Sequence, residues 1–184
     1  MTGVSCPSRR ILALFLPRLP TDRLHRRAKG ASWLSSGLPA DEPPLVVFAR
    51  VGNAFRLEAV DVRAAELGLA VRQPLAEARA RVPSLTVVER DEEGEAETLE
   101  AIADWCDRFT PLIGIDRDFD GEAGLFLDVT GVAHLFGGEA AMAEEVAARI
   151  AGNGFEARAA IAGSAAAARA VVRCGLGEAR TRVV

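Results

Sequence analysis

The sequence is poor in the side chains that build metal centres and disulfide frameworks. Its 184 residues include two histidines, three cysteines and no tyrosine. Two histidines are too few for a histidine-rich metal site. The cysteines, Cys6, Cys106 and Cys174, have no paired spacing, which favours reduced thiols over a disulfide framework. Because phenylalanine and tryptophan are also scarce, we expect a core of alanine, valine, leucine and isoleucine.

Long apolar runs are absent as well. The longest is far shorter than the roughly 20 residues that cross a bilayer, and the N-terminus lacks the apolar core and cleavage site of a secretory signal. We therefore expect a cytoplasmic protein with no membrane segment. Apolar residues make up 49% and charged residues 26% of the chain, a globular composition. The length suits one domain, or one domain with a small insert.

Lysine is nearly absent, and the charge is unevenly distributed. Lys29 is the one lysine, so the positive charge is almost all arginine. Residues 1–90 hold 14 basic and 8 acidic side chains, a balance of +6, whereas residues 91–184 hold 8 and 18, a balance of −10. The basic half is compatible with a polyanionic partner. The plainer interpretation is scattered, solvated arginines on helix surfaces.

Short strands alternate with helices along the chain. The continuous apolar run 11–16 predicts a strand that is buried on both faces, and Gly52-Asn53 predicts the turn of a hairpin over 45–60. The order strand, strand, helix, strand over 112–162, joined by strand 11–16, predicts an α/β (α+β) fold with a mixed sheet and helices on one face. The other predicted elements are helices at 61–68, 74–81, 91–109, 139–151 and 164–173 and a strand at 85–88.

The residues around positions 109–131 carry a resemblance to a known family. Phe109-Thr110-Pro111-Leu112, followed by Leu127-Asp128-Val129-Thr130-Gly131, resembles the central palm motif of Y-family translesion DNA polymerases. Further stretches resemble that family in the same order along the chain: 11–16, 45–62, 67–69, 74–78, 83–85 and 161–164. The resemblance implies a palm-like domain at 9–16 and 85–170, a small fingers-like insert at 17–84, and the truncated start of a thumb-like region at 171–184.

The departures from the family pattern concern its catalytic positions. The family holds two Mg²⁺ ions with three carboxylates, and the resemblance places these at Phe15, Ala123 and Gly124, none of which is acidic. The family's triphosphate-binding tyrosine, arginine and lysine correspond to Val62, Ala65 and Ala165, which cannot donate to phosphate. The pattern is similar to the inactive ImuB-like branch. It implies a degenerate nucleotidyltransferase that has no cofactor and does not polymerise.

The resemblance implies that the protein functions as an adaptor in DNA repair and damage-induced (SOS) translesion mutagenesis. The implied partners are DNA, a sliding clamp, a RecA-like accessory protein and an error-prone replicative-type polymerase, with the protein at the nucleoid when it is bound to DNA. Two alternatives stay open at this point. One is an active translesion polymerase that binds Mg²⁺ through Asp120, Glu122 and Asp128, and the other is a palm-like domain with an unrelated sensor role.

A few single residues are candidates for a site. Asp128 is either a lone metal ligand or a corner residue that accepts backbone hydrogen bonds near Thr130. His134 is more simply a packed or surface histidine than a ligand or base, and Cys106 lies on an apolar helix stripe.

Three further residues are candidates for contacts with partners. Trp33 lies in a polar stretch, where it is either an anchor for a partner or a ring that packs into the domain. Arg169 and Arg173 lie one helical turn apart and are candidate contacts to DNA phosphates. A solvated helix face is the alternative for both arginines.

Overall fold

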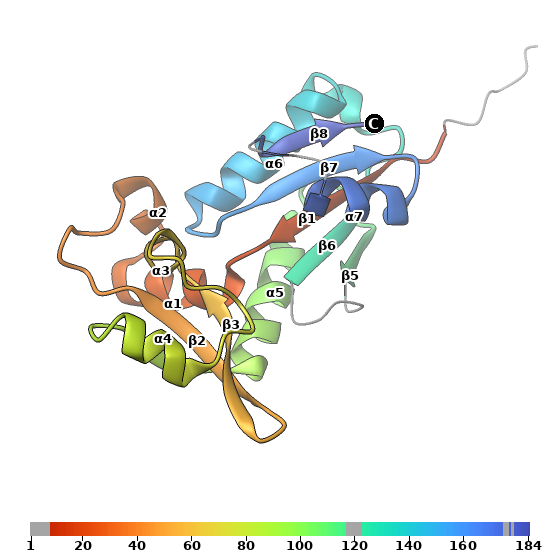
Figure 1. The fold of residues 1–184 in the computed structure, drawn as a ribbon. Coiled ribbons are helices and arrows are strands. Elements are labelled where there is room, and N and C mark those ends of the chain that lie inside the picture. Colours follow the sequence, from red (N-terminus) through yellow and green to blue (C-terminus); the bar gives the residue numbers. More distant parts are fainter. Residues whose placement is uncertain (1–7, 117–122, 175–176, 178) are drawn as a thin grey trace, which may run out of the picture. The chain divides into compact units, whose positions relative to one another are not determined.

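The computed structural model describes residues 8–116, 123–174, 177 and 179–184 (Figure 1). The chain divides into two compact units. The first consists of Met1–Pro17, Thr98–Ala151 and Ala157–Val184, and the second of Arg18–Glu97 and Gly152–Glu156.

The first unit contains a five-stranded sheet in the order β5-β6-β1-β7-β8. Strand β1 pairs antiparallel with both β6 and β7, and β7 pairs parallel with β8, so the sheet is mixed, as predicted. Within the described residues, the strands are β1 (Ile11–Leu16), β5 (Ile113–Asp116), β6 (Ala123–Asp128), β7 (Arg158–Ala162) and β8 (Thr181–Val183).

The central strand β1 is buried along its whole length, as its apolar run predicts. Leu12, Leu14 and Leu16 point to one face and are fully buried. Ala13 and Phe15 point to the other face, where they pack against α7 (Ala165–Cys174). Figure 1 shows α7 in front of β1 and β6, with α6 (Glu139–Gly152) behind β7. The predicted palm-like sheet is therefore confirmed, and α7 in addition covers part of its second face.

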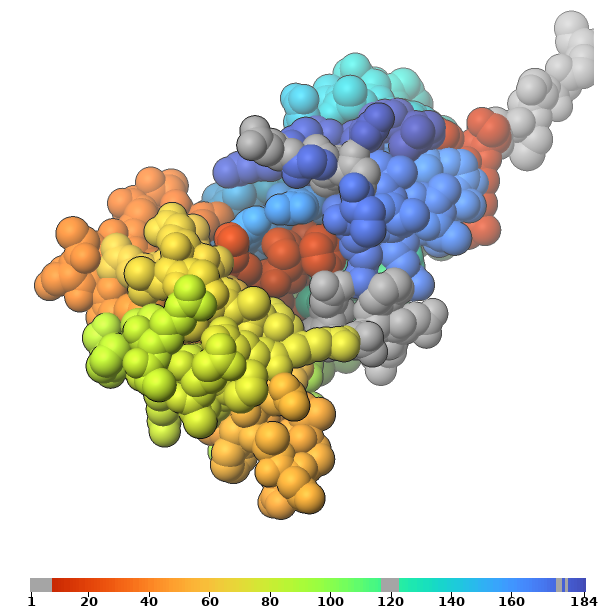
Figure 2. Space-filling view, viewed as in Figure 1, coloured from red at the N-terminus to blue at the C-terminus, as the bar shows by residue number. Residues whose placement is uncertain are grey.

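The second unit is built on a three-stranded sheet in the order β3-β2-β4. Strands β2 (Leu45–Val51) and β3 (Ala54–Val60) form the predicted hairpin, with Gly52 at a φ of +62° in its turn. The turn projects from this unit, and Val51 and Phe55 beside it are half exposed (Figure 2). Four helices complete the unit: α1 (Leu19–Lys29), α2 (Trp33–Ser36), α3 (Val62–Glu66) and α4 (Leu75–Arg81).

The observed units differ from the expected domain boundaries at three places, and one of these is that Gly152–Glu156 belongs to the second unit instead of the palm-like part. Strand β4 (Thr86–Glu89) was expected in the palm-like part, but it pairs in parallel with β2 and so belongs to the second unit, which extends to Glu97. Strand β8 lies in the segment expected to begin a thumb-like region. It instead pairs with β7 and stays within the first unit.

Helix α5 (Glu92–Cys106) has 15 residues, and glutamates fill its first turn, where they favour the positive end of the helix dipole. A 3-10 helix, η1 (Ala133–Phe136), precedes α6. Among the residues that the structure describes, no helix is long and apolar enough to cross a membrane.

Cys106, at the end of α5, is fully buried, and burial raises the pKa of its thiol to about 12. Since the thiolate is the reactive form, we expect Cys106 to resist alkylation by iodoacetamide in the native chain and to react once the chain is unfolded in urea. The exposed Cys174 serves as an internal control that reacts in both states. Peptide mass mapping after timed labelling measures both rates. Equal native rates at the two residues would contradict the buried placement.

Candidate functional site

The strand register brings together the three positions at which the resemblance predicts metal-binding carboxylates. Phe15 of β1 lies directly opposite Gly124 of β6, and Leu16 lies opposite Ala123. Positions 15, 123 and 124 are therefore neighbours at one end of the β1–β6 pair. The side chains present there are a phenyl ring, a methyl group and a hydrogen atom, and none of these can bind a metal ion.

The backbone around Gly124 leaves little room for a side chain. A Cβ atom at this position would lie 3.1 Å from the carbonyl oxygen of Leu14 and 3.5 Å from the Cβ of Asp116. Asp116 pairs with Gly124 across β5 and β6, and its side chain is almost completely buried. Its carboxylate makes an ion pair with Arg169 of α7. The carboxylate beside Gly124 is thus already bonded to a cation of the chain itself.

Helix α7 holds both of its arginines against the sheet. The guanidinium of Arg169 lies 5.1 Å from the ring centroid of Phe126, and that of Arg173 lies 5.0 Å from the ring centroid of Phe15. These distances suit cation–π contacts. The two arginines expected as phosphate contacts therefore both have partners within the first unit.

Asp128 lies at the opposite end of β6, where it pairs with Ile11. It lies four positions along the strand from Gly124, a distance of about 13 Å. Its Oδ1 accepts a hydrogen bond of 3.1 Å from the backbone N–H of Thr130, and its Oδ2 accepts one of 3.3 Å from Arg9. Hydrogen bonding by Thr130 and the nearby charge of Arg9 hold the pKa of Asp128 below its usual value. Asp128 thus fits the second of its two interpretations, a corner residue that accepts a backbone hydrogen bond near Thr130.

The remaining candidate ligands form no cluster. Asp120 and Glu122 lie outside the described residues. His134 is exposed on η1, at the rim of a depression next to Arg10 and Glu139. The guanidinium of Arg10 donates two hydrogen bonds, of 2.7 and 2.6 Å, to the Glu139 carboxylate. No group of three or more histidine, cysteine, aspartate or glutamate side chains that could hold a metal is present in the described ranges.

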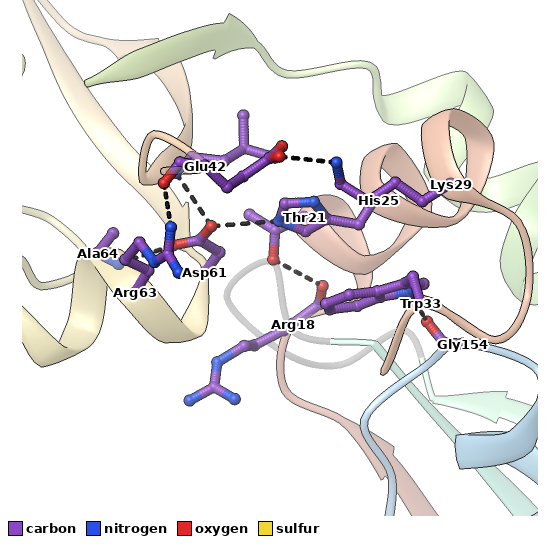
Figure 3. A network of polar contacts seen from close by, with 11 residues as sticks. Arg18, Thr21, His25, Lys29, Trp33, Glu42, Asp61, Arg63, Ala64 and Gly154 are labelled. Atoms are coloured by element: carbon purple, nitrogen blue, oxygen red, sulfur yellow. Dashed lines mark hydrogen bonds and ion pairs between the residues drawn. The ribbon is translucent and has the colours of Figure 1, made fainter. Parts of the chain in front are cut away.

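Trp33 is buried in the second unit, which agrees with the second of its two interpretations, a ring that packs into the domain. Its side chain is only 5% exposed, and its Nε1 donates a 2.8 Å hydrogen bond to the backbone carbonyl of Gly154 (Figure 3). Its ring lies 4.6 Å from the ring of His25. The polar stretch around Trp33 thus folds inward at α2, because the indole finds both an apolar surface and a hydrogen-bond acceptor.

A buried polar network next to Trp33 was not anticipated from the sequence. Asp61 begins α3, and its Oδ1 accepts a 2.7 Å hydrogen bond from the backbone N–H of Ala64. Its Oδ2 accepts a 3.0 Å hydrogen bond from the backbone N–H of Leu45 and lies 3.2 Å from Nε2 of His25 (Figure 3). The sequence signal that could have revealed this network is an aspartate directly before a helix. The hydrogen bonds of Asp61 connect α1, β2 and α3 within one unit.

Asp22 of α1 is a second buried carboxyl in this unit. Its side chain is 1% exposed, and its Oδ2 accepts a 2.7 Å hydrogen bond from the backbone N–H of Glu156. Burial raises the pKa of Asp22 to about 7, with the hydrogen bond from Glu156 acting in the opposite direction. Asp22 therefore acts as a packing residue that resists ionisation.

The fold defines the class of protein. The post-insertion binary complex of Dbh DNA polymerase superposes on 95% of this chain and 48% of its own, with a TM-score of 0.73 and 14% identity. DinB from Sulfolobus solfataricus superposes on the same fractions of the two chains, 95% of this one and 48% of its own, with a TM-score of 0.69 and 15% identity. The fold is therefore that of the Y-family DNA polymerases over about half of their length.

Sequence comparison gives the family. A profile of the impB/mucB/samB family matches residues 37–173, well over half of the chain. Protein ImuB from Caulobacter vibrioides, found in two strains, is 48% identical over 94 residues, which make up 51% of this chain and 20% of that protein. This chain belongs to the impB/mucB/samB family and is ImuB-like, which confirms the resemblance in its sequence. It spans about a fifth of the curated relatives that it matches.

Proposed function

We propose that this chain is a non-catalytic member of its family, which acts as a DNA-binding and protein-binding adaptor in damage-induced translesion mutagenesis. One observation carries the proposal: the register of β1 and β6 places Phe15, Ala123 and Gly124 together, and none of them is acidic. The curated relatives named ImuB support the role in DNA damage.

The geometry argues against a substitute metal site. Two-metal phosphoryl transfer needs carboxylates that clamp ions about 3.5–4 Å apart, and Mg²⁺ binds oxygens at about 2 Å. Asp116 is engaged by Arg169, and Asp128 lies about 13 Å along the strand from Gly124. Neither carboxylate is available to replace the three that the resemblance places at this centre.

The positions expected to hold a nucleotide triphosphate support the same proposal. Val62 and Ala65 lie on α3, and Ala165 begins α7. Their side chains have no donor or positive charge for a phosphate. Incoming nucleotide would therefore lack both the metal ions and the protein donors that position it.

DNA is the partner that the solved relatives favour, since two of them are named as ternary or binary complexes of a DNA polymerase. The positive balance of residues 1–90 supplies charge for phosphates. A sliding clamp, a RecA-like accessory protein and an error-prone replicative-type polymerase are the protein partners that we propose for the adaptor.

We expect the purified chain to bind primer–template DNA without extending it. Fluorescence anisotropy of labelled DNA should show binding at 50 mM salt that weakens by about 10- to 100-fold at 200 mM, as a few phosphate contacts require. In the same mixtures, with all four nucleotides and either Mg²⁺ or Mn²⁺, the primer should keep its length on a sequencing gel.

Dbh DNA polymerase in parallel reactions is the positive control for extension. Primer extension by the chain itself would overturn the non-catalytic assignment and favour carboxylates such as Asp120 and Glu122 as ligands. Absence of binding at 50 mM salt would overturn the DNA-binding part and leave a role in protein contacts alone.

A further inference from the structure

A groove runs along one edge of the sheet in the first unit, between α5 and β5. Its volume is about 330 Å³. The α5 side contributes Glu100, Asp104 and Asp107, and the β5 side contributes Ile113 and Ile115. One wall is therefore acidic, and the other is a strip of branched apolar side chains.

Strand β5 is the outermost strand on this side of the sheet. Among the described strands it pairs only with β6. The backbone N–H of Asp128 donates a 2.9 Å hydrogen bond to the carbonyl of Leu112, which fixes the phase of the antiparallel ladder. Because bonded and non-bonded pairs alternate, Gly114 bonds towards β6, whereas Ile113 and Ile115 direct their N–H and C=O groups to the open edge.

The same two residues therefore offer both kinds of contact that an added strand needs. Side chains two apart lie on one face of a strand, and those of Ile113 and Ile115 are half-buried on the groove side. Their main-chain N–H and C=O groups point away from β6, within the plane of the sheet. An open edge of this kind accepts a further strand through main-chain hydrogen bonds, with pockets that select the side chains.

The charge of the groove selects among possible occupants. Among the described residues that line it, none carries a basic side chain. Arg108, close by in the sequence, stacks on Trp105, with its guanidinium 3.9 Å from the ring centroid. The carboxylates repel DNA phosphates. They also disfavour a second copy that pairs its own β5 here, because two acidic walls would then lie close together.

We propose that this groove binds an extended segment of a partner protein, in which lysine or arginine alternates with branched apolar residues. The segment adds to β5 as an antiparallel or parallel strand. Its main chain bonds to Ile113 and Ile115. Because alternate side chains lie on opposite faces of a strand, its basic side chains share the groove side, where their methylene stems cover these isoleucines and their charged ends face the acidic wall. Its branched apolar side chains lie on the other face and favour the extended conformation. This inference goes beyond the proposed function and stands on the groove alone.

The test is a titration of the whole chain with a labelled, end-blocked hexapeptide of alternating arginine and valine. We expect saturable binding by fluorescence anisotropy. The double variant D104K/D107K should weaken it at least 10-fold, because reversal of two exposed charges turns attraction into repulsion. Asp104 is exposed on α5 and Asp107 is exposed in the turn that follows it, so the variant should fold, which circular dichroism verifies.

Two matched peptides separate strand addition from simple charge attraction. A peptide of alternating glutamate and valine should not bind. The arginine–valine peptide with N-methyl groups on alternate residues keeps its charge but loses main-chain donors, and it should bind at least 10-fold more weakly. Equal binding of the methylated and parent peptides would overturn strand addition, and absence of binding by the parent would overturn the proposal.

Sedimentation of the chain alone tests the other possible occupant of the groove, a second copy of the chain. We expect a monomer whose sedimentation is the same for the native chain and D104K/D107K. A native dimer that dissociates in this variant would assign the groove to a second copy and overturn the proposal. These outcomes do not bear on DNA binding or primer extension, so the two proposals fail separately.

Discussion

Replacement of Asp22 by asparagine should stabilise the chain at pH 8, by up to about 4 kcal/mol in free energy of unfolding. The basis is the pKa of Asp22, which burial raises to about 7 from 3.8. About three pKa units correspond to roughly 4 kcal/mol between the two protonation states. Asparagine removes the cost of a buried charge, and its Oδ1 still accepts the hydrogen bond from the N–H of Glu156.

The direction of this change in the free energy of unfolding follows from proton binding. Below pH 3.8 the carboxyl is protonated in the folded and the unfolded state, so D22N should differ little from the native chain there. As the pH rises from 3.8 to about 7, the unfolded chain releases this proton while the folded native chain keeps it, so the native chain loses stability that D22N keeps. Above about pH 7 the difference stays nearly constant. Urea denaturation from pH 4 to 8 measures the divergence. The exposed Asp41→Asn is the control, and parallel curves for D22N and the native chain would show that Asp22 ionises freely.

Replacement of Trp33 by alanine should destabilise the chain by about 3–5 kcal/mol, the usual cost of removing a buried indole. The variant loses the ring contact with His25 and leaves the carbonyl of Gly154 without its indole donor. Urea denaturation followed by circular dichroism is the measurement, since the substitution removes a fluorescent residue.

Two further variants show which part of the indole matters. W33F keeps a ring against His25 and loses only the N–H, so it should cost about 1 kcal/mol from the hydrogen bond plus a smaller packing loss. Trp105→Ala removes a half-buried indole and should cost less than W33A. If W33A left the free energy of unfolding unchanged, Trp33 would have to be exposed, and its role as an anchor for a partner would return.

The elements that the sequence predicted well are those with a local signal. Strand β1 was recognisable because an unbroken apolar run is typical of a strand covered on both faces, and the structure buries all six of its residues. The hairpin was recognisable because Gly52-Asn53 supplies a turn between two apolar segments. Each signal lies within one short stretch of the chain, residues 11–16 for the strand and residues 45–60 for the hairpin, so no distant partner was needed to interpret it.

The features that the sequence left open or did not predict depend on distant partners. The indole of Trp33 is buried because it reaches Gly154, 121 residues away. Arg169 meets Asp116, 53 residues away. Strand β4 joins the second unit through parallel pairing with β2, and β8 joins β7 in the same way. A parallel pair has no connecting turn to mark it, and composition does not reveal which strand will be the neighbour.

The same distinction between local signals and distant partners applies to the candidate site. Sequence comparison by motif placed Phe15, Ala123 and Gly124 as the three positions to inspect, and the strand register makes them neighbours. It did not show that Arg169 and Arg173 lie against Phe126 and Phe15. A helix face alone does not tell whether an arginine points to solvent or to an aromatic ring that lies elsewhere in the sequence.

The close approach of Leu14 to Gly124 bears on whether this chain could accommodate acidic side chains at the positions where the family resemblance expects them. A side chain at position 124 would start 3.1 Å from a carbonyl oxygen in the middle of the sheet, where the backbone has little freedom to retreat. An acidic residue at position 15 would remove a ring that packs with Ala168 and Val172. A carboxylate at either position would thus disturb the packing within β1, β6 and α7. If the proposed non-catalytic role holds, a catalytic site could not be built here by single substitutions without a loss of stability.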